Sequence, residues 1–408
     1  MPAERSARYE YVIVGLLALF WGTVGLNRFG IGTIFPVIVP EFQLAGWQAG
    51  LLISGTSVTW ALASWIGGFL SDRHGRRRVL LPAVGFVGLM TGAMGLAQGF
   101  LSMFVIRDLL GIGDGVGWSV GQATINEESA PSRRGINQAI FTLGYTLIGV
   151  GVGGIIITRM TSWFGWRAVF PIIGLVTLLI CAALSILMRE PAIREEKPAD
   201  WRSAVGLLRN PSLVFITIAG CAVLSWLQII VGFNVLYLTK IRAFSLTDAG
   251  LVASFWGFAG AAGQILVPLA SDHLGRRPVV CASALVSAVT LTVYLLGDQG
   301  FWPMLGLAML CGFCGFGLLP VVLATCVSET VSDEIRDAAL GMTNFFGVIV
   351  GTTLMPLIGG VLVDTFSLTA TLAIAVVAQL VVAAAILMIK ETAPRIVARN
   401  AGSATAPA

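Results

Sequence analysis

Twelve stretches of the chain are apolar and about as long as a helix that crosses a lipid bilayer. Such a helix needs about 20 residues, because the hydrocarbon layer is about 30 Å thick. That layer holds no water, so every backbone N–H and C=O group must pair within the protein, which favours helices. We therefore predict an all-α membrane protein. The predicted spans are 11–39, 46–71, 79–98, 101–126, 136–159, 167–188, 212–239, 246–271, 279–297, 302–328, 337–363 and 368–389.

The composition is typical of a protein whose surface faces lipid. Hydrophobic residues make up 56% of the 408 residues and charged residues only 11%, whereas soluble proteins carry about 25% charged residues. The net charge of +4 is small and not clustered on one helix, so it gives no case for binding nucleic acid. We expect a multi-pass protein of the plasma (inner) membrane.

One long polar stretch divides the predicted spans into six and six. We predict an N-terminal six-helix bundle over 1–188, a cytosolic linker with a short interfacial helix over 189–211, and a C-terminal bundle with a short cytosolic tail over 212–408. The first apolar run is too long for the core of a signal peptide, so we expect it to remain as the first span.

The positions of the basic residues predict the orientation of the helices. Lysine and arginine accumulate in loops on the cytosolic side of a membrane. Of the 25 basic residues, nineteen lie in the tails and loops of one side and four on the other side. Both termini are therefore predicted to be cytosolic. Arg28 and Arg107 lie inside spans.

Two segments of the first half recur in the second half at an offset of 200 residues. Residues 49–51 (AGL) recur as 249–251, and residues 71–77 (SDRHGRR) recur as 271–277 (SDHLGRR). Parallel repeats of this kind are known in membrane transporters. We therefore expect two pseudo-symmetric halves.

Three motifs resemble those of the major facilitator superfamily. They are residues 68–77 (GFLSDRHGRR) after the second span, residues 107–113 (RDLLGIG) in the fourth, and residues 166–170 (WRAVF) at the start of the sixth. The second copy of the loop departs by having Pro268 where the family has glycine. The resemblance implies two six-helix bundles around a central cavity that opens alternately to the two sides.

The repeated loop is predicted to act as a conformational latch. Asp72 lies at a cytosolic helix end beside four arginines, where a carboxylate can pair with guanidinium groups and with a helix N-terminus. The alternative is that these charges only set the orientation. The predicted latch residues are Gly68, Asp72, Arg73, Gly75, Arg76, Asp272, Gly275 and Arg276.

Arg28, Arg107 and Asp114 lie well inside predicted spans of the first half and call for an explanation, because a charge at mid-membrane costs at least about 2.5 kcal/mol. Arg28 is mid-span, and Asp114 follows Arg107 by seven residues, about two turns along one helix face, with Gly111 between them. Two arginines against one carboxylate leave a positive surplus, which attracts a carboxylate or phosphate.

Asp114 and Arg107 are the predicted proton-coupling residues. Burial favours a protonated carboxyl and a neighbouring guanidinium favours the carboxylate, so the two effects compete at Asp114. The alternative is a static Arg107–Asp114 packing pair.

The pattern of residues 107–115 (RDLLGIGDG) is similar to the fourth helix of the anion:cation symporter branch of the superfamily. That branch carries organic anions with protons or sodium. Its first helix commonly has Asp-Arg, whereas this chain has Asn27-Arg28, so the anion-binding arginine matches and the acid does not.

The second half has no lysine or arginine within a span, which argues against a phosphate ester as substrate. A neutral polar or aromatic side chain within a span either contacts the substrate or only contributes to the packing of helices. The predicted substrate-binding residues are Arg28, Asn27, Trp118, Gln122, Tyr145, Trp226, Gln228, Asn234, Trp256 and Asn344.

Residues 145–154 (YTLIGVGVGG) bear on the direction of transport. Drug-exporting relatives carry a proline in this stretch of the fifth helix, where this chain has Val150. The absence of the kink-forming proline favours uptake.

We therefore expect a monomeric, proton-coupled importer of a small organic anion, a monocarboxylate. One alternative is a proton-coupled exporter of drugs or metabolites, and another is a receptor that binds the anion without transporting it. We expect neither an enzyme nor a cofactor, because the six cysteines lie in apolar runs and the two histidines in basic loops, which leaves no nucleophile, base or metal set.

Overall fold

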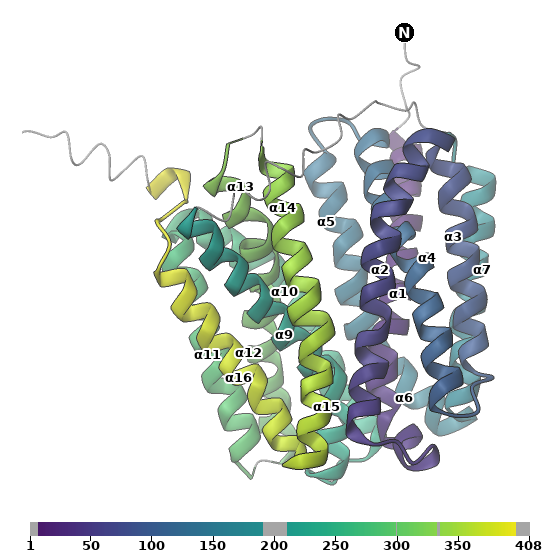
Figure 1. Ribbon diagram of the computed structural model, residues 1–408, viewed down its shortest axis with the longest axis vertical. Helices are drawn as coiled ribbons and strands as arrows, with labels where there is room; N and C mark the ends of the chain where they lie inside the picture. The colour runs from purple at the N-terminus through teal and green to yellow at the C-terminus, as the bar shows by residue number, and fades with distance from the viewer. Residues whose placement is uncertain (1–6, 191–209, 299, 333–334, 397–408) are drawn as a thin grey trace, which may run out of the picture. The chain divides into compact units, whose positions relative to one another are not determined.

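The computed structural model describes residues 7–190, 210–298, 300–332 and 335–396, and the described residues form helices and short connections, with no strand among them. The predicted interfacial helix of the linker lies outside these residues. The helices of the first half are α1 (Ala7–Glu41), α2 (Gly46–His74), α3 (Arg76–Met94), α4 (Phe100–Glu128), α5 (Arg134–Gly144), η1 (Tyr145–Val152), α6 (Gly153–Phe164) and α7 (Trp166–Leu187) (Figure 1).

The second half repeats this order of spans, except that its fourth span is interrupted by a π-helical segment. Its helices are α9 (Pro211–Lys240), α10 (Leu246–Leu274), α11 (Arg276–Leu296), α12 (Phe301–Pro320), η2 (Val321–Thr325), α13 (Cys326–Thr330), α14 (Arg336–Phe346), η4 (Gly347–Leu354), α15 (Met355–Thr365) and α16 (Leu368–Leu387).

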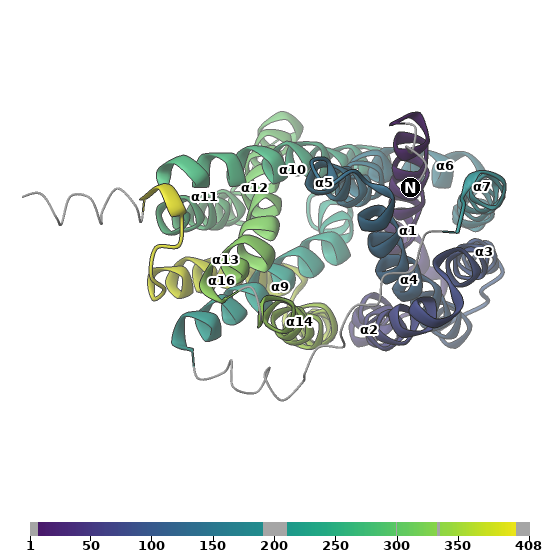
Figure 2. The ribbon, with the colours of Figure 1, turned by 90° about the horizontal axis from the view of Figure 1, so that it is seen from above.

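The helices pack as two compact units. The first comprises Met1–Glu196 with Asn234–Gly257, and the second comprises Lys197–Phe233 with Phe258–Ala408. In the first unit, α2 packs along α4, and α3 packs against both α4 and α7. α1 packs against η1, α5, α6 and α7, and Figure 2 shows α5 on one side of it and α6 and α7 on the other. In the second unit, α11 packs against α12 and α16.

Membrane-spanning length is confirmed for the predicted spans. Within the described residues, 11 helical segments are long and apolar enough to cross a bilayer. The remaining helix, α4, has 29 residues and is the one that carries Arg107 and Asp114. With α4 the two halves hold twelve membrane helices, six in each.

The fifth span of each half contains a π-helical segment, η1 in the first and η4 in the second. A π-helical segment widens the helix locally and is frequently found at functional sites. Because η1 begins at Tyr145, this irregular segment holds one of the predicted substrate-binding residues.

The loop between α2 and α3 turns on Gly75, and the equivalent loop between α10 and α11 turns on Gly275. Their φ angles are 99° and 103°. These positive values are unfavourable for residues with a Cβ atom. The repeated glycine therefore makes the same sharp turn possible in both halves.

Candidate functional site

α2 packs closely against α4 at the glycines that lie near Arg107 and Asp114. A Cβ atom on Gly111 would lie 2.6 Å from the carbonyl oxygen of Thr56. A Cβ atom on Gly115 would collide with the carbonyl oxygen of Trp60. The space beside Gly111 is thus filled by the backbone of α2, and Trp60 is held against α4 next to Asp114.

Asp114 pairs with Arg28 of α1. The distance between Arg28 Nε and Asp114 Oδ2 is 3.3 Å, and the two side chains are 15% and 0% exposed. Arg28 therefore reaches the surface of its unit while Asp114 is covered. Among the described residues, neither Arg28 Nη2 nor Asp114 Oδ1 has a hydrogen-bond partner. The pair is incomplete on both sides.

The sequence suggested that Arg107 pairs with Asp114, but the described hydrogen bonds of Arg107 go to backbone carbonyl groups. Its Nε donates to the carbonyl oxygen of Leu52 at 2.6 Å, and its Nη1 donates to that of Asn27 at 3.3 Å. The side chain is 2% exposed. Carbonyl oxygens of α1 and α2 solvate this guanidinium, and Arg28 takes the carboxylate. Arg107 still interacts electrostatically with both Arg28 and Asp114.

The side chain of Asn27 points toward α3 and away from the side chain of Arg28. Its Nδ2 donates to Thr91 Oγ1 at 2.7 Å, and the residue is 1% exposed. Neighbouring positions on a helix point about 100° apart, which separates Asn27 from Arg28. The structure therefore places Asn27 in the packing between α1 and α3.

Aromatic rings line the helices around Arg28. Trp118 lies against Trp21 in a tilted arrangement with ring centroids 4.7 Å apart, and Trp21 stacks on Tyr145 at 5.2 Å. Phe141 lies 5.6 Å from both tryptophan rings. Trp118 and Tyr145 are half-buried, as is Gln122 one turn further along α4. Three of the predicted substrate-binding residues thus lie on this aromatic side of the first unit.

Trp60 was not among the predicted residues. The guanidinium of Arg28 lies 5.3 Å from the centre of its ring, and the ring centroids of Trp60 and Trp118 are 6.4 Å apart. In the sequence, a tryptophan in an apolar span carries no signal of this contact. It follows from the packing of α2 along α4.

The predicted residues of the second half differ in exposure. Trp226, Asn234 and Trp256 are buried. Gln228 is half-buried and Asn344 is exposed. The ring of Trp226 packs edge-on against Phe316, with centroids 5.4 Å apart. For Trp226 this is a packing environment within the second unit.

The loop after α2 forms an ion-pair cluster around Arg76. Arg76 binds Asp72 and donates to Glu127 of α4 from Nε at 3.0 Å and from Nη2 at 2.8 Å. Arg76 is 4% exposed, so it connects the ends of α2 and α4 from a buried position. Arg73 lies outside the cluster, over the ring of Phe69. A Cβ atom on Gly68 would meet nothing within 4 Å.

The second half contains the equivalent cluster. Arg276 pairs with Asp272 and with Glu329, the latter at 2.9 Å from Nη2. The acidic partners Glu127 and Glu329 were missed in the sequence. The two glutamates recur at nearly the 200-residue offset of the loop motif. A carboxylate at a cytosolic helix end does not help to orient the helices, so this recurrence could have indicated another role for them.

A second pair of carboxylates covers the starts of α3 and α11. Glu190 Oε1 accepts from the backbone N–H of Arg77 at 3.2 Å, and Glu391 accepts from the N–H groups of Arg276 and Arg277. Burial disfavours the charge of Glu391, but the backbone N–H donors outweigh it and hold the pKa of this carboxyl below its usual value. Acidic groups stabilise helix N-termini in this way.

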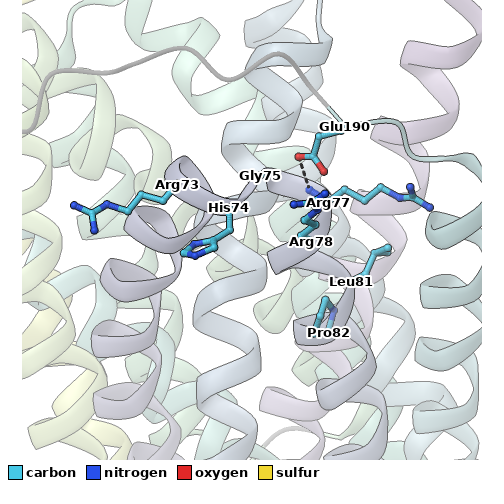
Figure 3. Close-up of a pocket in the computed structure, with 8 residues that line it drawn as sticks. All are labelled: Arg73, His74, Gly75, Arg77, Arg78, Leu81, Pro82 and Glu190. Carbon is cyan, nitrogen blue, oxygen red and sulfur yellow. Dashed lines mark hydrogen bonds between the residues drawn. The ribbon is translucent and has the colours of Figure 1, made fainter.

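Figure 3 shows Glu190 at the edge of a basic pocket of about 690 Å³ beside the α2–α3 loop. Arginines dominate its charge, in keeping with the predicted cytosolic side. The lining residues are Arg73, His74, Gly75, Arg77, Arg78, Leu81, Pro82 and Glu190.

The sequence matches the family model of the Major Facilitator Superfamily over residues 17–235 and 218–407. It is 27% identical over 334 residues to a probable 4-methylmuconolactone transporter of Cupriavidus pinatubonensis, covering 78% of this chain and 76% of that one. It is 25% identical to a probable L-galactonate transporter of Escherichia coli, covering 89% and 85%.

Solved structures match the fold over nearly the whole chain. A bacterial homolog of the human lysosomal transporter Spinster, in an inward-facing and unoccupied conformation, has a TM-score of 0.78 at 17% identity, covering 94% of this chain and 98% of that one. The nucleoside transporter NupG has a TM-score of 0.79 at 14% identity, covering 93% and 99%.

Proposed function

The chain belongs to the Major Facilitator Superfamily, and we propose that it imports a small organic anion, a monocarboxylate, by proton symport. Membership makes it a membrane transporter and not an enzyme. Relatives named as transporters of 4-methylmuconolactone, hexuronate and L-galactonate support an organic acid as the substrate. In this proposal the carrier is a monomer in the inner membrane with both termini in the cytosol.

The incomplete ion pair of Arg28 and Asp114 is the observation that carries the proposal. Its N–O distance of 3.3 Å is longer than the roughly 2.7–2.9 Å of a strong charge-assisted hydrogen bond. Arg28 is partly exposed and has a spare donor, Nη2. A substrate carboxylate therefore competes with Asp114 for the same guanidinium.

Competition for Arg28 couples proton binding at Asp114 to substrate binding. Protonation of Asp114 removes the charge that holds Arg28, so the guanidinium becomes available to the incoming carboxylate. By linkage, bound substrate raises the affinity of Asp114 for the proton by the same factor. Arg107, bound to backbone carbonyls, stays charged and keeps the site attractive to anions. This exchange replaces the predicted one between Asp114 and Arg107.

We place the conformational latch in the clusters around Arg76 and Arg276. Each cluster joins the second and fourth helices of its half at the predicted cytosolic end. In alternating access the ends of these helices must move, and a buried arginine shared by several carboxylates has more than one stable set of partners. The latch thereby stabilises one conformation over the other.

The Asp114→Asn variant tests the coupling in proteoliposomes that contain unlabelled benzoate and receive radiolabelled benzoate from outside. We expect this variant to exchange benzoate across the membrane but to lose acceleration by an inward proton gradient, because asparagine resembles a permanently protonated acid. Asp108→Asn, on the same helix, is the control and keeps both activities. Proton-driven accumulation by Asp114→Asn equal to that of the wild type would exclude Asp114 as the coupling group.

The alternative of an exporter predicts a different result. Cells that express the protein would resist amphipathic drugs, and the Arg28→Ala variant would protect them as well as the wild type. Import of an organic acid predicts that Arg28→Ala abolishes uptake.

A further inference from the structure

Trp60 presents an unpaired hydrogen-bond donor beside Arg28. Its indole Nε1 is buried and has no partner among the described residues, and the same holds for Arg28 Nη2. The two side chains are in contact, with the guanidinium 5.3 Å from the indole ring centre. A buried donor without an acceptor costs about 1–3 kcal/mol. Two such donors on touching side chains indicate that an acceptor belongs between them.

A carboxylate is the group that satisfies both donors at once. It has two oxygens and accepts about four hydrogen bonds. One oxygen can take Arg28 Nη2 while the other takes Trp60 Nε1. Asp114 does not fill this role, because it already accepts from Arg28 Nε through Oδ2 and bonds to no atom of Trp60 among the described contacts. Both donors are therefore open to an acceptor that the substrate supplies.

The surfaces next to these donors are aromatic. Trp118 lies 6.4 Å from Trp60, centroid to centroid, and both rings are half-buried. Behind Trp118 lies Trp21, followed by Tyr145. A flat unsaturated ring gains stacking energy on such a wall. A chain of hydroxyl groups would instead need many polar partners, and these ring faces supply none.

We infer that Trp60 is a second donor to the substrate carboxylate and that the substrate is an aromatic or conjugated monocarboxylate. The inference rests on the proposed function, since it takes Arg28 as the primary carboxylate site. Trp60 thereby sets where the carboxylate lies, and Trp118 selects the flat group attached to it.

The substrate class is tested by competition between two acids of similar size in wild-type proteoliposomes. Benzoate and cyclohexanecarboxylate carry the same carboxylate, but only benzoate has a π face. Stacking of about 0.5–1.5 kcal/mol converts to a preference for benzoate of about two- to tenfold. We expect Trp118→Leu to remove this preference while both acids remain substrates.

The role of Trp60 is tested by Trp60→Phe, which keeps an aromatic ring and deletes only the N–H group. A hydrogen bond to a charged group contributes about 1.5–3 kcal/mol, so we expect the KM for benzoate to rise roughly 10- to 100-fold at unchanged maximal rate, with the proton dependence retained. Trp163→Phe, at an exposed position of α6, is the control and leaves the KM unchanged. A purely structural role for Trp60 would lower the amount of folded carrier and the maximal rate instead.

The outcomes separate this inference from the proposed function. If both acids are transported with equal affinity, or Trp60→Phe retains the wild-type KM, the inference is overturned and import of organic acids stands. If wild-type vesicles take up neither acid and Arg28→Ala changes nothing, both proposals fail.

Discussion

At the residue scale, two arginines of the first half carry the same charge but differ in exposure and in their partners. Arg107 and Arg28 both lie within the membrane span, yet Arg107 is 2% exposed and bound to backbone carbonyls. Arg28 is partly exposed and holds a carboxylate loosely. Arg28 is thus the more exposed of the two and keeps an unpaired donor, Nη2, so in the proposed function anion binding depends on it more than on Arg107.

The Arg28→Lys variant should separate charge from geometry at this position. Lysine keeps the positive charge but lacks the planar fork that holds a carboxylate through two donors. Hydrogen bonds to charged groups contribute about 1.5–3 kcal/mol, so we expect affinity for benzoate to fall roughly 10- to 100-fold. Thermal-shift titration of the purified protein measures it, and wild-type affinity in this variant would contradict a bidentate role.

At the scale of elements, glycines decide which helices approach closely enough to form the site. Gly111 and Gly115 admit the backbone of α2. A Cβ atom on Gly25 would lie 2.8 Å from both Gly149 Cα and the carbonyl oxygen of Tyr145. The first contact places Trp60 beside Asp114, and the second holds Tyr145 next to the helix that carries Arg28.

A methyl group at Gly115 should therefore disrupt the site without changing its chemistry. Gly115→Ala meets backbone, which cannot rotate away, so we expect a loss of about 1–3 kcal/mol in stability and a larger loss of benzoate uptake. The melting temperature and the transport rate report the two effects. Gly92→Ala on α3 is the matched control, since its Cβ atom meets nothing within 4 Å; an equal loss in both variants would refute the packing argument.

The clusters around Arg76 and Arg276 permit a paired prediction. Glu127→Gln and Glu329→Gln each remove a charged acceptor from a buried arginine, so we expect each to cost about 1.5–3 kcal/mol. Because the clusters lie in different units and share no partner among the described contacts, the two losses should add in the double variant.

Melting temperatures of the two variants and the double variant provide the measurement. Asp248→Asn, which changes an exposed carboxylate bonded to Ser245, should leave the melting temperature nearly unchanged. A double variant no less stable than either single one would show that the clusters are not independent.

At the scale of the whole molecule, the two halves share structure that supports the repeat in the sequence. Each has a sharp turn on a glycine after its second helix, an arginine cluster beside it, and a π-helical segment in its fifth span. The halves differ in charge, because the second has no lysine or arginine within a span. In the proposed function, the common parts serve the motion of the carrier and the charged first half binds the anion.

The predicted orientation can be tested on the complete chain. A C-terminal fusion of green fluorescent protein should fluoresce, and a C-terminal fusion of alkaline phosphatase should be inactive, because nineteen of the 25 basic residues favour a cytosolic position for both termini. The reverse pair of results would place the latch clusters on the outer side.

The sequence by itself determined the number and approximate limits of the spans, the internal repeat and the presence of charges within the spans. Hydropathy and repetition are properties of the chain taken in order, so they can be read without knowing which helices are neighbours. Only the tertiary structure decided that Asp114 pairs with Arg28 and that Trp60 joins them. Helical periodicity predicts the face on which a side chain lies, but the packing of α1, α2 and α4 selects the partner opposite that face.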